Sequence, residues 1–517
     1  MLRWLRLTPW MVALTAVLVL PRPGITAGLE DPLPPLQIRL AQALGQSATG
    51  SAPGGMALSL REAIAISLQN NLDVTVEGYN PRLREQELIN ARAAYDPTAF
   101  LEGTRTESRN PVSASFVTKP GANYSLWDWN TGIREQLPTG GSYEFRFNNE
   151  YLRSQALGNS YTSRLILTLN QPLLRNFGFE VNLTNIRIAT NNQSISREQL
   201  RLRVSTVVTS VQNAYFDLIF AVENLGVQQR SLSLAQDLVT LNQARVRAGV
   251  AAPVEVTQAE AQRAAQVQNV ILAEKAIRDA EDNLRVILNL PATGAAWGQE
   301  LRPTDSATFL PVQTDLDAAI KAALENRNEY RSAKLDIDNR ELQVRLARNQ
   351  LLPDLSLQGI FSLAGGQPVY ADALSQLGTP TYPTYTVGVV LTVPIGNRAA
   401  ESNYIHAELS RDQGKASLRG LELTIVQQVR EGVRRVEAFA RRVDANRAAR
   451  VLAEEQLRVE QRRLEAGVST TFNVLSFQRD LAAAQANEIQ AITDYNKALA
   501  NLDSVQGTVL ERNRIQM

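Results

Sequence analysis

Two long stretches of this chain carry apolar stripes at the spacing of a coiled coil. In each, apolar residues recur at alternating intervals of three and four, which is the heptad pattern of a packed helix seam. The first stripe consists of Val204, Val208, Val211, Tyr215, Leu218, Val222 and Leu225. The second consists of Val426, Val429, Val433, Val436, Ala440 and Val443. An ordinary two-helix coiled coil would produce the same stripes, so the pattern alone does not define the fold.

The length of these helices sets them apart from the helices of a globular core. The first is expected to run over residues 181–247, which corresponds to about 100 Å, and to return over 254–290, which covers only about 55 Å. The rest of the long helix therefore needs partners stacked end to end on the returning one, and segments 58–72 and 81–95 are the candidates. Residues 400–466 and 471–506 are expected to repeat the scheme.

Alternation with a period of two predicts β-structure between the helical stretches. Segment 143–148 places aromatic residues on one face and polar residues on the other, which suits a sheet between lipid and water but also a half-buried sheet in a globular protein. Strands are expected at about 98–171, as one hairpin or as two if the turn at 137–141 divides them. A further hairpin is expected at about 355–393.

Closure of the sheet decides how many chains are needed. Backbone groups in lipid must all be paired, so a spanning sheet cannot keep open edges. One chain offers four strands, or six with the extra hairpin, whereas membrane barrels begin at about eight. Three chains would supply about twelve strands, or about eighteen with six each. The sequence therefore predicts a mainly α-helical fold in which a trimeric β-barrel continues into an α-helical coiled-coil barrel.

The chain also repeats itself. Residues 245–250 (RVRAGV) align with 463–468 (RLEAGV), and the same shift places Val256 on Val474. The protein is thus expected to contain two copies of one unit. Their bounds and those of the flanking segments are 1–27 for a signal peptide, 28–56 for a flexible leader, 57–290 for the first repeat, 291–311 for a linker, 312–507 for the second repeat and 508–517 for a C-terminal tail.

The signal peptide is indicated by a basic start followed by a short apolar run. Arg3 and Arg6 precede an apolar stretch over 10–20, and Thr26 and Ala27 offer small residues for cleavage. An apolar run of about 11 residues is too short to span a bilayer as a helix, which takes roughly 20. A retained membrane anchor is the less favoured alternative.

Composition argues against several functions. The 53 basic and 52 acidic side chains nearly cancel, which disfavours a nucleic-acid partner. The chain has no cysteine and a single histidine, His406, so no cofactor or metal site is expected and no enzyme activity is expected. After removal of the signal peptide, Met56 and Met517 are the remaining methionines, which weighs against a copper-selective path.

The two Gly-Val tips with their flanks, the run 170–175 (NQPLLR) and the run 393–395 (VPI) together resemble the TolC family of outer-membrane factors. The resemblance covers nearly all of the expected mature chain. It implies a homotrimer in contact with outer-membrane lipid, which reaches into the periplasm of a Gram-negative-type bacterium. It also implies docking onto a periplasmic adaptor (membrane fusion) protein and an inner-membrane transporter, for efflux or type I secretion.

The resemblance further implies that the helix-turn-helix tips form the tunnel entrance and meet the adaptor. By match, the tip residues are Arg247, Ala248, Gly249, Val250, Ala466, Gly467, Val468 and Ser469. The entrance residues are Glu255, Asn473 and Ser476. Glu255 matches an acidic position of the family, whereas Ser469 stands where some relatives carry an arginine and Asn473 and Ser476 where some carry aspartates. A strong charged latch is therefore not expected, although a threefold ring of Glu255 would repel anions.

The alternative is a periplasmic scaffold or adaptor protein built on a coiled-coil hairpin. Such a protein would explain the long helices. It would not explain the aromatic strand at 143–147 or the duplication of the whole unit.

Overall fold

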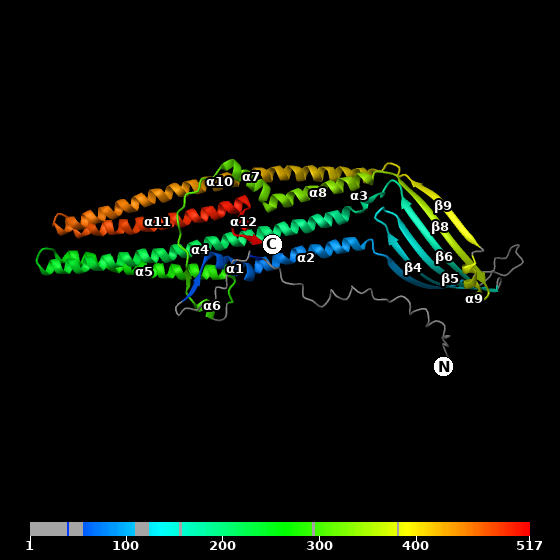
Figure 1. The fold of residues 1–517 in the computed structure, drawn as a ribbon, viewed down its shortest axis with the longest axis horizontal. Helices are drawn as coiled ribbons and strands as arrows, with labels where there is room; N and C mark the ends of the chain where they lie inside the picture. The colour runs from blue at the N-terminus through cyan, green and yellow to red at the C-terminus, as the bar shows by residue number, and fades with distance from the viewer. Residues whose placement is uncertain (1–38, 41–54, 109–123, 155–157, 292–294, 380–381) are drawn as a thin grey trace, which may run out of the picture.

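A computed structural model describes residues 39–40, 55–108, 124–154, 158–291, 295–379 and 382–517. The expected signal peptide and most of the expected leader lie outside these residues. The molecule is elongated, with a curved sheet at one end and the tips of two helix hairpins at the other (Figure 1).

Two long helices run most of the length of the molecule. They are α4 (Thr184–Arg247, 64 residues) and α10 (Arg398–Glu465, 68 residues), each about 100 Å long at the α-helical rise. On the tip side, α4 pairs with α5 (Pro253–Leu288) and α10 with α11 (Thr471–Gln506). Figure 1 shows both pairs as antiparallel hairpins.

The sheet-side half of each long helix has a different partner. There, α2 (Leu72–Ala93) packs on α4, and α8 (Asn328–Asn349) packs on α10. Two shorter helices, α1 (Leu60–Asn70) and α7 (Leu316–Asn326), lie between the two halves. The prediction of one long helix beside shorter stacked helices is therefore confirmed in both repeats.

The start of α2 differs from the expectation. A helix was expected to begin at Pro81, but α2 begins at Leu72 and contains Pro81. Asn71 explains the earlier start, because its side chain accepts a hydrogen bond from the backbone N–H of Val74 at 3.2 Å and so caps the helix. The cap and the nine helical residues that precede Pro81 outweigh the one backbone hydrogen bond that Pro81 cannot donate.

The heptad stripes form the hydrophobic cores along the long helices. Val204, Val208, Val211 and Leu218 of α4 are fully buried, as is Val429 of α10. Towards the tip the first stripe thins out: Val222 is 38% exposed.

Two buried tyrosines hold the segment between the repeats. Tyr215 donates to the carbonyl of Leu58 and lies 2.9 Å from Asp305 Oδ2, and burial raises the pKa of Tyr215 to about 12. Tyr495 donates to the carbonyl of Leu310 at 2.8 Å. The segment at 301–312 is thereby fastened to both repeats.

The short elements near the middle of the molecule extend the expected repeat bounds. Strand β2 (Met56–Leu58) pairs in parallel with β7 (Leu301–Pro303), so the end of the expected leader and part of the expected linker belong to one small sheet. The expected C-terminal tail contains α12 (Val509–Arg512) and β10 (Ile515–Gln516), which pairs with β1 (Arg39–Leu40). Val509 and Ile515 are buried in the core of the first repeat.

Six antiparallel strands form the large sheet. They are β3 (Thr98–Ser108), β4 (Tyr124–Gln136), β5 (Ser142–Ser154), β6 (Gly158–Pro172), β8 (Asp354–Gln367) and β9 (Pro383–Thr392), in the spatial order β3-β4-β5-β6-β8-β9. The turn at 137–141 does divide the first repeat into two hairpins. Within the described residues, the outer edges of β3 and β9 have no strand partner.

The two faces of the sheet differ in chemistry. Directly paired residues of neighbouring strands point to the same face, and successive residues to opposite faces. The register therefore defines one apolar face, which includes Trp129, Ile133, Phe145, Phe147, Leu165, Leu167, Leu169, Phe361, Leu363, Val387 and Val389. The opposite face includes Glu102, Asn130, Arg146, Asn148, Glu150, Arg164 and Thr168. Ion pairs lie on the polar face, such as that between Arg146 and Glu144 of β5 at 2.8 Å.

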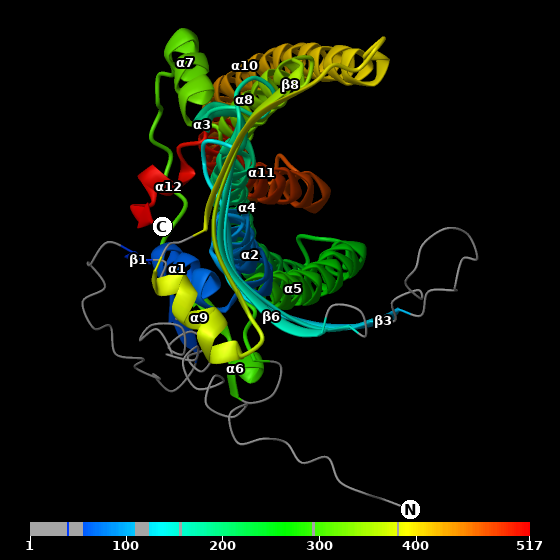
Figure 2. The same ribbon diagram turned by 90° about the vertical axis from the view of Figure 1, so that its right-hand side faces the viewer.

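One short helix interrupts the second repeat. Helix α9 (Tyr370–Gly378) connects β8 to β9 and was not expected from the sequence. Figure 2 shows it against the convex side of the sheet. None of the helices in the described part of the chain combines the length and the apolar character needed to cross a membrane.

Candidate functional site: the helix-hairpin tips

The two tips end their long helices with the same hydrogen-bonding motif. At the first, Gly249 N–H donates to Val246 O at 3.0 Å and Val250 N–H donates to Arg245 O at 3.0 Å. At the second, the equivalent bonds from Gly467 and Val468 are 3.1 and 2.9 Å long. This is the Schellman motif, and it needs a left-handed residue, which both glycines supply with φ of 72° and 75°.

The tips present small and apolar side chains to solvent. Arg247, Ala248 and Ala466 are exposed, and Val250 and Val468 are 67% and 66% exposed. A Cβ added at either tip glycine would meet no atom within 4 Å. The tips are therefore open turns, in which nothing in the chain itself crowds the glycines.

The returning helices begin differently at the two tips. Helix α5 starts with Pro253 at its first position and has no side-chain cap. Helix α11 is capped by Thr470, whose hydroxyl accepts from Asn473 N–H at 3.4 Å. Repetition of the chain thus preserves the end of each long helix but not the start of the helix that follows.

A buried polar cluster ties one hairpin to the other just behind the tips. Thr471 of α11 donates to Glu255 Oε2 at 2.7 Å, and its hydroxyl lies 3.2 Å from Asn242 Oδ1. Asn242 in turn donates to the backbone carbonyl of Glu255 at 3.2 Å. Thr471 and Asn242 are fully buried. Arg245 approaches Glu255 to 3.9 Å, which is an ion-pair distance but too long for a hydrogen bond.

The entrance residues expected from the sequence do not come together. Glu255 is partly buried in the cluster with Thr471, Asn473 is exposed on the first turn of α11, and Ser476 is partly buried. Ser469 hydrogen-bonds to Glu460 rather than to the first hairpin. Within one chain, Glu255 is engaged by Thr471, and its place in a ring of three copies stays a prediction.

Asn242, Thr471 and Glu460 were missed by the sequence analysis. All three are polar side chains that the structure buries close to the tips. The available signal was weak: a polar residue on the apolar side of a long helix indicates a partner, but not which partner.

A groove between the hairpins lies next to the tips. It has a volume of about 270 Å³ and is lined from α4 by residues including Arg230 and Leu234, and from α11 by residues including Gln478 and Leu481. Gln478 also donates to the carbonyl of Leu234 at 3.4 Å across this groove.

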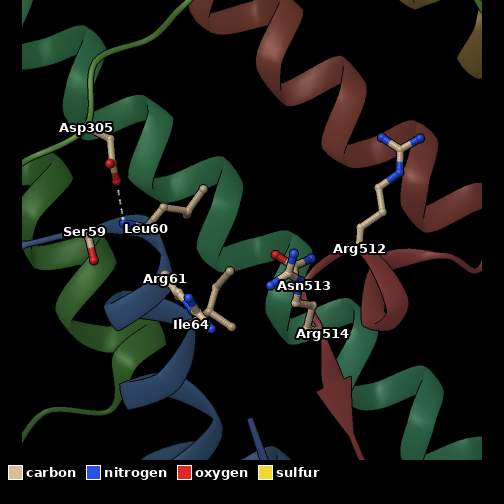
Figure 3. A pocket seen from close by; sticks show the side chains of 8 residues that line it. All are labelled: Ser59, Leu60, Arg61, Ile64, Asp305, Arg512, Asn513 and Arg514. Carbon is tan, nitrogen blue, oxygen red and sulfur yellow. Dashed lines mark hydrogen bonds between the residues drawn. The ribbon is translucent and has the colours of Figure 1, made fainter. Parts of the chain in front are cut away.

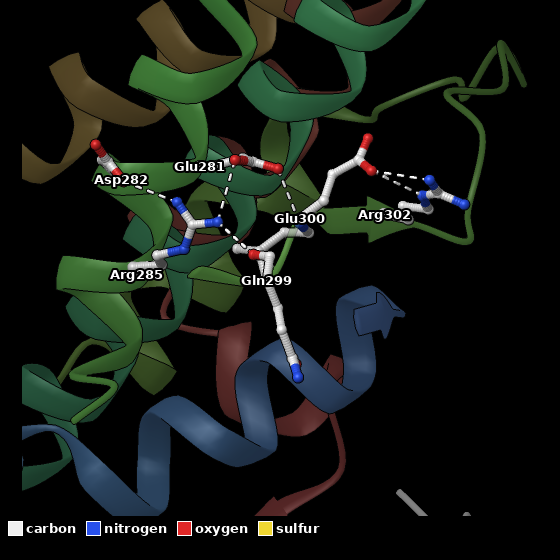
Figure 4. Close-up of polar contacts among 7 residues, drawn as sticks. Glu281, Asp282, Arg285, Gln299, Glu300 and Arg302 are labelled. Atoms are coloured by element: carbon white, nitrogen blue, oxygen red, sulfur yellow. Dashed lines mark hydrogen bonds and ion pairs between the residues drawn. The ribbon is translucent and has the colours of Figure 1, made fainter. Parts of the chain in front are cut away.

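A second polar cluster fixes the segment between the repeats to α5 (Figure 4). The buried Arg285 donates to Glu281 at 3.1 Å, to Asp282 at 2.7 Å and to the carbonyl of Gln299 at 2.6 Å. Glu281 also accepts from the backbone N–H of Leu301 at 2.8 Å. The Nη1 and Nη2 donors of Arg285 are thus aimed at protein groups, whereas its buried Nε has no hydrogen-bond partner among the described residues. The three contacts fasten the segment between the repeats to α5.

A cavity of about 370 Å³ lies near the middle of the molecule between α1 and the C-terminal elements (Figure 3). Arg61, Arg512 and Arg514 are among its lining residues, and Asp305 accepts from the backbone N–H of Leu60 at 2.8 Å. The carboxylate of Asp305 thus accepts a hydrogen bond from the first residue of α1. The lining residues include no nucleophile–base pair. Among the described residues, no group of three or more His, Cys, Asp or Glu side chains could hold a metal ion.

Comparison with known proteins identifies the family. The model of the family described as "Outer membrane efflux protein" matches residues 64–290 and 319–508, which correspond to the two repeats. Since these ranges cover most of the chain, the protein belongs to the outer membrane efflux protein family. This family is described by efflux, not by catalysis.

Individual relatives are distant. The chain is 27% identical over 321 residues to the pyoverdine export outer membrane protein OpmQ of Pseudomonas putida, a match that covers 59% of this chain and 63% of the relative. It is 24% identical over 458 residues to the outer membrane protein OprJ of Pseudomonas aeruginosa, with 86% and 87% covered. The match to the Nodulation protein T of Rhizobium leguminosarum bv. trifolii likewise spans only 63% of that protein.

Among solved structures, the outer membrane protein VceC from Vibrio cholerae has a TM-score of 0.61 at 17% identity. The match covers 87% of this chain and 96% of VceC. The shared architecture confirms the mainly helical fold with long helix pairs and a strand sheet.

Proposed function

We propose that this protein is a passive outer-membrane duct of a tripartite efflux or type I secretion system. In this proposal three copies form one channel that leads from the periplasm to the exterior. The observation that carries it is a six-stranded sheet with one apolar face and one polar face, mounted on helices about 100 Å long. Its two edges have no strand partner in the described part of the chain.

The unpaired edges support the trimer. A sheet exposed to lipid cannot leave the N–H and C=O groups of β3 and β9 unpaired. Six strands are too few to close a membrane barrel, which begins at about eight. If β9 of one copy pairs with β3 of the next, three copies close a barrel of about eighteen strands, the larger of the two numbers that the sequence allowed.

The faces of the sheet support its orientation. The apolar residues would contact lipid, and the polar residues would line a water-filled lumen. In Figure 2 the helices α5 and α11 lie towards the concave side of the sheet, so the helical part would continue the same lumen.

The tips support docking to a periplasmic adaptor that in turn engages an inner-membrane transporter. Open glycine turns, the exposed Val250 and Val468 and the groove near Leu234 offer small and apolar surface for a partner's helices. The Thr471–Glu255 bond would hold the two hairpins together, and its loss would accompany opening of the entrance.

A periplasmic scaffold or adaptor remains the other reading of the long helices. It gives no reason for the alternation of apolar and polar residues across six strands, and the family match also favours the duct.

Adjacent residues on β6 provide the test. Leu167 points to the apolar face and Thr168 to the polar face. Arginine at a lipid-facing midplane position costs about 2–4 kcal/mol per copy, whereas a lumen position tolerates it. We expect Leu167→Arg to abolish a heat-resistant trimer in outer-membrane fractions, and Thr168→Arg to retain it. A protein recovered as a water-soluble monomer, or equal effects of the two variants, would contradict the proposal.

A further inference from the structure

Helix α9 lies on the apolar face of the sheet, at the end far from the tips (Figure 1). The ring of Tyr370 is 5.6 Å from Trp129 and 5.6 Å from Tyr161, both of which point to that face. The Tyr370 hydroxyl donates to Asn149 Oδ1 at 3.2 Å. The helix therefore covers the outside of the sheet, not the polar lumen side.

In the covered region a polar pair interrupts the apolar rows, and beyond it the same face continues with Trp127, Tyr151 and Tyr161. On β5 and β6 the residues that follow Phe147 and Leu165 towards the far end of this face are Asn149 and its paired partner Ser163. Ser163 donates to Asn149 Oδ1 at 2.8 Å, and both residues are at most 1% exposed. Without the helix, this polar pair would face outward beside the apolar rows.

Close packing holds the helix in place. Ala373 of α9 is fully buried, and its carbonyl oxygen lies only 2.1 Å from where a Cβ would stand on Gly365 of β8. Gly365 is paired with Ser163, so it shares the outer face. The next residue, Gly366, points the other way and would meet nothing within 4 Å.

The outward side of α9 is not suited to hydrocarbon. Its exposed residues are Ala371, Asp372, Ser375 and Gly378. A carboxylate is among the most costly groups to place in the bilayer interior. The apolar and aromatic side of the helix faces the protein, and the small and polar side faces away.

The height of the apolar band agrees with this. From Leu355 to Leu363, β8 covers nine positions below the Asn149–Ser163 row. At about 3.3 Å per residue and a strand tilt of about 40°, these positions span about 23 Å of membrane height, close to the apolar band of about 25 Å seen in membrane barrels. The hydrocarbon layer is thus filled before α9 is reached.

We propose that α9 lies in the headgroup layer of the outer leaflet, where one copy per chain forms a collar around the channel. There it seals the Asn149–Ser163 pair from the hydrocarbon and presents Asp372 and Ser375 to polar headgroups. The proposal rests on the proposed function, because it requires the apolar face of the sheet to contact lipid.

The absence of cysteine from the chain allows a direct test with single nitroxide labels. Labels are attached at Asp372→Cys on α9, at Val387→Cys on β9 and at Lys275→Cys on α5. The full-length protein is reconstituted in phosphatidylethanolamine–phosphatidylglycerol bilayers. The accessibility of each label to molecular oxygen, which concentrates in hydrocarbon, and to a water-soluble nickel chelate is then measured.

We expect position 387 to be oxygen-accessible and protected from nickel, position 275 to be fully nickel-accessible, and position 372 to fall between them. A label at 372 that matches 275 would show that α9 stands clear of the membrane, and one that matches 387 would show that it is immersed. Either result overturns the inference. Nickel access at 387 equal to that at 275 would instead refute the membrane role of the sheet.

Two neighbouring glycines provide matched variants. Gly365→Val would collide with the α9 backbone, so the label at 372 is expected to gain mobility and at least twofold nickel accessibility. Gly366→Val adds the same side chain on the opposite face and is expected to leave the label unchanged. Equal responses to the two variants would show that packing on Gly365 does not hold the helix on the outer face.

Discussion

In the first repeat, α2 is followed by four strands and the short helix α3 (Phe179–Asn182) before the long helix begins. In the second repeat, α8 is followed by two strands with the short helix α9 between them. At the opposite end of the molecule, the long helices of both repeats end in the same Schellman turn at Gly249 and Gly467. The two copies have thus kept their tips alike while their sheet ends diverged.

Packing explains the difference. A residue inserted into α4 would rotate every following side chain out of the seam it shares with its neighbours. A hairpin added at the edge of a sheet only needs to continue the hydrogen-bond ladder. Strands β3 and β4 hold such an edge position, so they can be added without altering the pairing of β5, β6, β8 and β9.

Removal of the edge hairpin would make the two repeats equal in strand number. Thr98 is paired with Arg134, so excision of residues 98–136 joins chain ends that lie close together. Barrel diameter grows roughly linearly with strand number, so we expect the sheet end of the trimer to narrow by about a third as eighteen strands become twelve. Electron microscopy of the purified trimer measures this. An unchanged diameter would show that β3 and β4 lie outside the barrel.

A charged side chain introduced at each tip tests whether the two tips contribute equally to docking. We expect Gly249→Arg and Gly467→Arg each to reduce efflux about tenfold, equivalent to about 1.4 kcal/mol of docking free energy, while the trimer still assembles. Gly467→Ala is the control, because it strains the same left-handed backbone without bulk or charge. Accumulation of a fluorescent efflux substrate reports the loss. Full efflux in both arginine variants would contradict a docking role.

The bond between the hairpins concerns opening of the channel, not docking. Thr471→Val keeps the shape of the side chain but leaves Glu255 and Asn242 without the hydroxyl. A hydrogen bond to a charged group contributes about 1.5–3 kcal/mol, so we expect a larger open fraction of the channel, measured as single-channel conductance in planar bilayers. Thr471→Ser retains the hydroxyl and is expected to behave as the parent. An open fraction lower than the parent's would exclude this bond as a restraint on opening.

The effect expected at Asp503 on α11 is on the stability of the fold and leaves the channel itself unchanged. Burial raises the pKa of its carboxyl to about 6, although Arg512 at 3.1 Å acts in the opposite direction. The folded state therefore binds this proton more tightly than the unfolded state, and the free energy of unfolding should fall as pH rises from about 4 to about 6.

We expect Asp503→Asn to stabilise the protein by on the order of 1–3 kcal/mol above pH 6 and to have no effect near pH 4. Thermal unfolding across this pH range provides the measurement. Arg512→Gln should steepen the pH dependence, because it removes the opposing charge. A gain from Asp503→Asn that is constant with pH would assign it to packing instead.

Much of the helical architecture could be predicted because each turn of a coiled coil repeats the same constraint. The spacing of the valines in α4 indicated which side of the helix packs against its neighbours, and the tip glycines indicated where the long helices end. Pro81 led to a helix start predicted too late in the chain. Proline removes only one backbone hydrogen bond from α2, and the cap at Asn71 and the rest of the helix outweigh that loss. The number of strands stayed open between four and six because the turn at 137–141 could be read as part of one long hairpin.

The polar contacts behind the tips could not be predicted, because they join residues far apart in the sequence. Thr471 and Asn242 are separated by 229 positions, and the sequence around either residue does not indicate that the other is its partner. The match to relatives indicated an acidic position at Glu255 but not that Thr471 donates a hydrogen bond to it. Helix α9 was not predicted because it is short and packs on a sheet, so it lacks the repeated heptad spacing of a helix that packs on another helix.

The long helices α4 and α10 are continuous, whereas their companions are interrupted halfway, between α5 and α2 and between α11 and α8. Because α5 and α11 are not continuous with α2 and α8, a shift of a returning helix along its long helix does not require the helices next to the sheet to move. Rearrangement of the tips is therefore compatible with an unchanged pairing of the strands.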